Sequence, residues 1–417
     1  MVDVPPDRSN RSILIGTRPP LWLLMLFAVM SPFSLLIFFP ALPSLADELG
    51  VGLGSAQWVI TGFLIGVGTM QLVIGPLVDR IGRRTVVLTG LILYIVSSAI
   101  AAAAGSVQSL IGLRVAQAIC VASLSVVSRA TVQDVFAGTD AGRAMSFITL
   151  ALQLPSLLAP AIGGVLVVYA GWQSLFLLLT AIAVALFVLA YRYLPETRPD
   201  ARAVSSAPSR VLSDYARLAR NPQFSTNAGI VALTAAAAMT LLTVFPAALT
   251  DLFGQSPDAI GYYTSAYSLI AILGALASAQ LVARFGIAPL MASVLAVTVI
   301  YIAGYLLWSQ ALSFTLTNLF ISVSVIGFSQ SILVSMGFAR AVEADDALRG
   351  TASGFAGAFA SIVSAGFAAA GASVYAFGLS MSLAVVLLCF VLSSSISGSL
   401  ILRDRRAGQR SPMTDSP

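Results

Sequence analysis

The chain has 417 residues, of which 58% are hydrophobic and only 9% are charged, and its mean hydropathy is +0.94. Because soluble domains carry about 25% charged residues, this composition excludes an ordinary soluble protein and predicts a membrane protein with many spans. The net charge of +5 comes from 22 arginines with neither Lys nor His, and because these arginines are scattered over short loops, they indicate membrane topology rather than nucleic-acid binding.

Long apolar runs begin directly after the polar tail at residues 1–20, which lacks the apolar core of a signal peptide. About 20 apolar residues span a bilayer as a helix, and the runs lack the alternation of a β-barrel. We therefore expect an all-α membrane protein with 12 transmembrane helices in two pseudo-symmetric six-helix bundles. The expected helices cover residues 21–43, 56–78, 85–104, 110–132, 146–168, 174–193, 226–248, 260–282, 287–308, 313–335, 352–374 and 378–401.

A polar stretch divides these helices into two sets of six. With both termini in the cytoplasm, every arginine except Arg114 falls on the inner side, as the positive-inside rule requires. Within the polar stretch, Val211 to Ala219 is predicted to form a short surface helix near anionic lipid. The expected parts are a cytoplasmic tail (1–20), an N-terminal bundle (21–194), a cytoplasmic linker (195–223), a C-terminal bundle (224–402) and a cytoplasmic tail (403–417).

The turn from Gly75 to Leu88 holds four charges between two apolar helices, which must therefore be antiparallel neighbours. A degenerate copy of residues 77–83 occurs at residues 281–287, an offset of 281 − 77 = 204 residues, or about half the chain. We interpret the two copies as an internal duplication.

Arg114 is expected inside the fourth helix, where a charge costs roughly 2.5–3.5 kcal/mol and needs a polar cavity or a partner. Snorkelling to the outer surface is the alternative. Gln117, Ser125 and Ser128 share its helix face, which favours a cavity. Adding 204 to Arg114 gives Asn318, which shares a similar face with Ser322 in the tenth helix, so we expect both helices to line a central substrate site.

Further polar or aromatic positions in four other helices are candidates for the same site. For each of them, ordinary helix packing is an equally good interpretation. They are Ser34 and Phe38 in the first helix, Gln57 and Thr61 in the second, Phe245 in the seventh and Tyr267 in the eighth.

Charges at the inner ends of the second and fourth helices are candidates for a conformational switch between the bundles. Asp79 could pair with Arg83 or Arg129, and Asp134 lies just beyond. The alternative is a set of solvated loop charges, each pair worth about 0–1 kcal/mol.

No Asp, Glu or His lies near the middle of an expected span, although proton-coupled carriers usually need such a group. The spans also lack the His, Cys or acid clusters of an intramembrane enzyme, and the longest polar stretch is too short for a receptor's ligand domain. We therefore expect no enzyme activity, no metal and no cofactor.

Three motifs resemble those of the major facilitator superfamily, and within it the bicyclomycin- and chloramphenicol-resistance branch of drug:proton antiporters. The pattern G-x-L-x-D-R-x-G-R-R is matched in full from Gly75 to Arg84, whereas R-x-x-Q-G has Ala118 in place of its glycine and G-P-x-x-G-G begins with Ala159. Shorter pieces also fit, namely Phe39 to Pro43, Leu194 to Thr197 and Ser256-Pro257.

The resemblance implies a role for each motif. It assigns the inward/outward switch to the first motif, with Gly75, Asp79, Arg80, Gly82 and Arg83; proton or substrate handling to Arg114; and export to the antiporter motif with Pro160, Gly163 and Gly164. Many relatives have an acid where this chain has Leu36, so coupling would have to use Asp79 or Asp134, or be absent.

These observations predict a bacterial inner-membrane secondary transporter that exports small amphipathic molecules or drugs by alternating access, coupled to proton influx. The alternative is a metabolite importer or an uncoupled facilitator of the same fold. Its expected partners are a small-molecule substrate, protons and the lipid bilayer, with no nucleic acid, and we expect a monomer.

Overall fold

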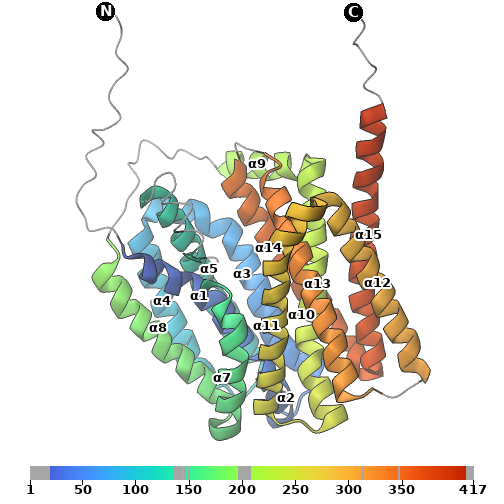
Figure 1. Cartoon of the computed structure of the whole chain (residues 1–417). Helices are drawn as coiled ribbons and strands as arrows, with labels where there is room; N and C mark the ends of the chain where they lie inside the picture. The colour runs from blue at the N-terminus through green and yellow to red at the C-terminus, as the bar shows by residue number, and fades with distance from the viewer. Residues whose placement is uncertain are drawn as a thin grey trace, which may run out of the picture.

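The computed structural model is a bundle of long helices that run roughly parallel or antiparallel to one another (Figure 1). No β-strand occurs in the part of the chain that it describes. That part comprises residues 19–135, 144, 147–148, 151–195, 208–311, 314–345 and 348–409.

The first half of the chain, here called the N-half, contains seven α-helices and one 3-10 helix within the described residues. Pro40 and Pro43 follow a turn at Ile37 and Phe38, and they separate α1 from α2 because proline lacks the backbone donor that a continuous helix needs. The helices are α1 (Leu21–Leu36), η2 (Phe39–Ala41), α2 (Leu42–Glu48), α3 (Leu53–Ile81), α4 (Arg83–Ala101), α5 (Val107–Val135), α7 (Leu154–Ala170) and α8 (Gln173–Tyr193).

The second half, here called the C-half, follows a short connecting helix and contains six long helices within the residues that the structure describes. The connecting helix is α9 (Pro208–Arg220), which confirms the surface helix predicted for this stretch. The helices of the C-half are α10 (Pro222–Phe253), α11 (Pro257–Phe285), α12 (Ile287–Ala311), α13 (Leu316–Val342), α14 (Arg349–Val374), η4 (Tyr375–Phe377) and α15 (Leu379–Gln409).

Eleven helical segments in the described residues are long and apolar enough to cross a membrane, and α7, with 17 residues, is a shorter apolar helix. Most of the residues before α7, where the fifth span was expected to begin, lie outside the described part of the chain. Apolar side chains such as Val188 on α8 and Ile300 on α12 are exposed on the outside of the bundle, as lipid contact requires.

The two halves meet along two helix pairs, α3 with α14 and α7 with α11. Both ends of the molecule are easily recognised in Figure 1. One end, here called the α9 end, carries α9, the start of α1 and the end of α15, and the other, the α2 end, carries α2.

Backbone geometry supports the predicted duplication. All six residues with positive φ in the described chain are glycines, and such positions favour glycine because it has no Cβ. They form three pairs with offsets of 254 − 50 = 204, 286 − 82 = 204 and 378 − 171 = 207 residues, so equivalent turns recur in the two halves. The pairs are Gly50 with Gly254, Gly82 with Gly286, and Gly171 with Gly378.

The helix α9 is docked on the C-half. Leu218 is fully buried, and Tyr215 packs against Phe355 of α14 with ring centroids 5.1 Å apart. Arg217 forms an ion pair of 2.8 Å with Asp345, which lies in the connection between α13 and α14. These contacts hold α9 against the C-half.

Candidate functional site

Arg114 is completely buried in the N-half, eight positions into α5. Its guanidinium donates three hydrogen bonds: Nη2 to the carbonyl oxygen of Ser34 at 2.9 Å, Nη1 to Oε1 of Gln117 at 2.9 Å, and Nε to the carbonyl oxygen of Val59 at 3.4 Å. The acceptors belong to α1, α3 and α5, so the side chain ties three helices together.

Two aromatic rings cover the Arg114 guanidinium. The ring centroids of Phe38 and Phe63 lie 4.4 Å and 4.1 Å from its central carbon, close enough for cation–π attraction. Gln117 in turn donates from Nε2 to Oγ of Ser98 at 2.8 Å, which extends the network to α4.

No acidic side chain pairs with Arg114 within the described residues. Carbonyl oxygens and ring faces offset its buried charge instead, and a planar guanidinium with five donors suits such a mixed site better than an ammonium. The hydroxyls of Ser34 and Tyr94, 2.6 Å apart, add a second buried polar contact between α1 and α4. Ser34, Phe38, Arg114 and Gln117, four candidates from the sequence analysis, therefore lie together. Their role in substrate binding stays a prediction.

A cavity of about 300 Å³ lies beside this network, toward the α9 end. Most of its wall comes from α1, α3 and α5 of the N-half, and Ser361 on α14 contributes from the C-half. The lining residues are Ala28, Ser31, Pro32, Leu35, Phe63, Leu64, Val67, Gln71, Ser125, Arg129, Ile148, Leu152 and Ser361.

Phe63 separates Arg114 from this cavity, because it lines the cavity and also covers the guanidinium. Arg114 itself is not a lining residue. The other arginine of α5, Arg129, does line the cavity and is only partly buried. The cationic side chain that lines the cavity is therefore Arg129, which the sequence analysis had assigned to the conformational switch.

A second polar site lies nearer the α2 end, between the halves. Nε2 of Gln57 on α3 donates to Oγ1 of Thr243 on α10 at 2.8 Å. Oε1 of Gln57 and Oγ1 of Thr61, one turn further along α3, are buried without a hydrogen-bond partner in the part of the chain described. Gln57 and Thr61 therefore belong to the boundary between the halves, and they do not line the 300 Å³ cavity.

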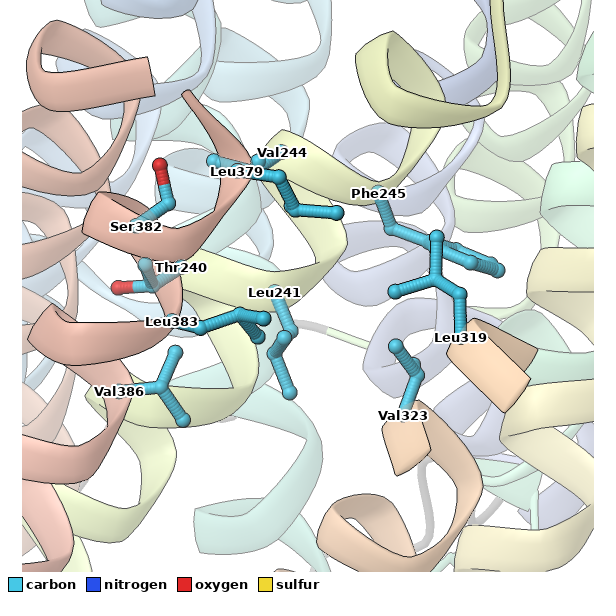
Figure 2. Close-up of a pocket in the computed structure, with 10 residues that line it drawn as sticks. All are labelled: Thr240, Leu241, Val244, Phe245, Leu319, Val323, Leu379, Ser382, Leu383 and Val386. Atoms are coloured by element: carbon cyan, nitrogen blue, oxygen red, sulfur yellow. The ribbon is translucent and has the colours of Figure 1, made fainter. Parts of the chain in front are cut away.

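The corresponding region of the C-half is mostly apolar, with Thr240 and Ser382 as its polar lining residues. A gap of about 10 Å³, room for about one water, lies between α10, α13 and α15, and Phe245 and Val323 line it (Figure 2). Since α5 begins at Val107 and α13 at Leu316, an offset of 316 − 107 = 209 residues relates the two helices, and Arg114 corresponds to Val323.

The predicted equivalence of Asn318 to Arg114 is therefore wrong, because the chain has gained five residues, 209 − 204, before α13. Oδ1 of Asn318 accepts from the backbone of Thr315 at 2.9 Å in a capping box, so Asn318 serves the start of the helix. Ser322 bonds to Asn318 O and to Tyr301 Oη, and Tyr267 packs on Gly327.

Comparison with known proteins decides the family. A model of the Major Facilitator Superfamily matches residues 24–369. The chain belongs to the major facilitator superfamily. This match confirms the fold class expected from the sequence. Of the 12 expected spans, the described residues show 11, together with one shorter apolar helix.

Superfamily members named for drug resistance are among the relatives. Multidrug resistance protein D of Escherichia coli K12 is 30% identical over 205 residues, which cover 49% of this chain and only 51% of that protein. A bicyclomycin resistance protein homolog of Haemophilus influenzae is 22% identical over 341 residues, which cover 82% of this chain and 85% of that protein. These names agree with the branch that the motifs resemble.

A solved superfamily structure confirms the fold. The crystal structure of a bacterial homolog to the human lysosomal transporter Spinster superposes with a TM-score of 0.75 at 15% identity, covering 92% of this chain and 96% of that chain. At this identity the likeness concerns the fold alone.

The superfamily's loop motif lies at the end of α3 and the start of α4. Gly82 has φ of 99° and ends α3, and Arg83 is buried, with Nη1 donating to Thr131 at 3.4 Å. The surroundings of Gly75 and the side chains of Asp79, Arg80 and Asp134 lie outside the described part. Arg129 donates from Nε to the carbonyl oxygen of Ser125 at 3.2 Å. The switch role of these residues stays a prediction.

The antiporter motif forms a close backbone contact between the halves. A Cβ at Gly163 would overlap the carbonyl oxygen of Ile37 in the same half, whereas one at Gly164 would overlap that of Pro257 on α11, in the other half. From the other side, a Cβ at Gly261 would overlap the carbonyl oxygen of Pro160. The glycines allow α7 and α11 to approach this closely at the α2 end.

The sequence analysis missed several residues at the site. Tyr94 and Ser98 stand four positions apart in an apolar helix, so they share a face that could have been recognised as polar. Gln71 is a polar residue in an apolar stretch of α3, toward the α9 end, and it could likewise have been recognised as a candidate from the sequence. The role of Phe63 had no such signal, because its contact with Arg114 depends on tertiary packing.

Proposed function

We propose that this protein is a secondary transporter that exports small amphipathic molecules across the bacterial inner membrane by alternating access. The α9 end, which carries the start of α1 and the end of α15, faces the cytoplasm, in line with the arginine distribution. The export is driven by proton influx, as in the branch that the motifs resemble.

The observation that carries this proposal is the 300 Å³ cavity. Its volume is that of a small ligand site, about 300–1,000 Å³, and it is lined by both halves, since Ser361 of α14 faces the residues of the N-half. Its wall combines apolar side chains with a few polar groups, which suits amphipathic compounds of varied shape.

The contacts toward the α2 end support alternating access. There the glycines of α7 and α11 bring the halves together, and Gln57 bonds across to Thr243. In this arrangement the α2 end is closed and the cavity lies on the side of the α9 end. The proposed export cycle opens these contacts and releases the substrate at the α2 end.

Arg114 has a structural and positioning role in this proposal. Its network fixes Phe38 and Phe63, and Phe63 forms part of the cavity wall. Ser34 and Gln117 act through the same network. Phe245, Tyr267 and Ser322 complete the proposed substrate path in the C-half, as predicted from the sequence, whereas Asn318 serves the start of α13.

Transport in proteoliposomes with an imposed pH gradient tests the function. A panel of amphipathic antibiotics is loaded on the α9 side, and we expect gradient-dependent movement of at least one class, abolished by an uncoupler. Movement of no compound in either direction would refute the export proposal.

Uncoupled facilitation is the second candidate, because Leu36 stands where many relatives have an acid. In that case the same assay gives downhill flux that an uncoupler does not change. Neither candidate requires a cofactor or a further protein.

A further inference from the structure

We propose that the cavity selects amphipathic substrates with an anionic end, and that Arg129 binds this end. The inference rests on the proposed transport function and names its substrate class. It concerns a residue that the motifs do not assign to substrate binding.

The first argument is the bonding of Arg129. Its one hydrogen bond to a described residue runs from Nε to the carbonyl oxygen of Ser125, one turn back along α5. The two terminal amino groups have no partner in the described part of the chain. They are the donors that bind carboxylate or sulfonate oxygens in a bidentate manner.

The second argument is the charge of the wall. Arg129 is the cationic residue of the lining, and no lining residue is acidic in the part of the chain described. A cationic ligand would therefore meet repulsion without compensation. An anionic ligand would offset a partly buried charge that the protein otherwise leaves to water.

The third argument is the distribution of polarity along the cavity. The helices α3 and α5 both run from the α2 end to the α9 end (Figure 1). On α3 the lining changes from Phe63, Leu64 and Val67 to Gln71, over about 12 Å at 1.5 Å per residue. Arg129 lies near the α9 end of α5, so the apolar part is deep and the polar part is at the cytoplasmic mouth.

Arg114 does not compete for this role. Its terminal amino groups already donate to Ser34 and Gln117, and its faces are covered by Phe38 and Phe63. The two arginines of α5 thus divide the tasks: Arg114 holds the helices and Arg129 faces the ligand.

Binding of three naphthalene compounds to purified protein in detergent tests the proposal. Calorimetry compares 2-naphthoate (anionic), 2-naphthamide (neutral) and 2-naphthylmethylammonium (cationic), which share one apolar group. We expect naphthoate to bind most tightly and the cation most weakly. Arg129→Gln should weaken naphthoate binding by roughly tenfold to a hundredfold, as expected for a charge-assisted hydrogen bond, and should change naphthamide binding by less than about twofold.

Two further variants make the test specific. Arg192→Gln removes the same charge at an exposed position of α8 outside the cavity, and it should leave all three affinities unchanged. Ser31→Glu places an acid in the wall and should reverse the order of naphthoate and the ammonium compound. This second variant also provides the answer if Arg129→Gln does not fold.

Equal binding of naphthoate and naphthamide to the wild type, or an unchanged naphthoate affinity in folded Arg129→Gln, overturns the anion assignment. In either case the cavity and the transport proposal stand, because naphthamide still binds. Failure of all three compounds to bind, together with no transport of any compound in proteoliposomes, overturns both proposals.

Discussion

Replacing Gly164 with valine should open the α2 end of the protein. A Cβ at this position would overlap the carbonyl oxygen of Pro257 and lie 3.0 Å from the Cα of Asp258. Both are backbone atoms and cannot rotate aside. Overpacking of this kind costs about 1–3 kcal/mol, and because the contact joins the two halves, the cost falls on the state in which they are closed here. The population of the open state should therefore rise roughly 5- to 150-fold.

Accessibility of a single introduced cysteine measures this shift. Thr61→Cys is suitable because Thr61 is buried near the α2 end and because both native cysteines, Cys120 and Cys389, are buried. A membrane-impermeant maleimide added from the α2 side should label it faster in Gly164→Val. The matched control is Gly112→Val, since a Cβ at Gly112 meets nothing within 4 Å. Equal labelling rates in folded Gly164→Val and wild type, or the same increase in the control, would refute the reasoning.

Three other changes test the remaining contacts. Thr243→Val leaves the buried amide of Gln57 without its partner, at a cost of about 1–3 kcal/mol, so labelling from the α2 side should rise; an unchanged rate contradicts the cross-half bond. Arg114→Lys loses the planar fork that reaches three acceptors, so thermal unfolding in detergent should begin several degrees lower; wild-type melting would contradict the network. Leu218→Ser should detach α9 and speed its proteolysis, whereas Arg217→Gln, whose side chain is 62% exposed, should change stability by less than about 1 kcal/mol. An equal effect of the two variants would contradict burial of Leu218 as the main contact that holds α9.

Most of the fold was predictable because its signals are local. An apolar run in the sequence indicates each span, and a glycine close to charged residues indicates turns such as those at Gly82 and Gly286. The need to satisfy a buried Arg114 was also predictable, since an arginine in an apolar helix demands acceptors. The short surface helix predicted from Val211 to Ala219 is observed as α9, Pro208–Arg220.

The partners at the site were less predictable, because they come from distant parts of the chain. The acceptor at Ser34 is 80 positions from Arg114, and nothing in the sequence indicates that a backbone carbonyl takes the place of a carboxylate. Asn318 was assigned by a fixed offset, and an insertion before α13 made this assignment wrong. Arg129 was assigned to the switch because it lies near other charges in sequence, although its helix face turns it to the cavity.

The charge on Arg114 also has an electrical consequence. A guanidinium without an acidic partner in the described part of the chain is a permanent positive charge inside the hydrophobic region. Moving one elementary charge through the full field does about 2.3 kcal/mol of work per 100 mV, so a displacement across one tenth of the voltage drop does about 0.2 kcal/mol. Any rocking of the N-half along the membrane normal therefore makes the cycle voltage-sensitive, whatever the charge of the cargo.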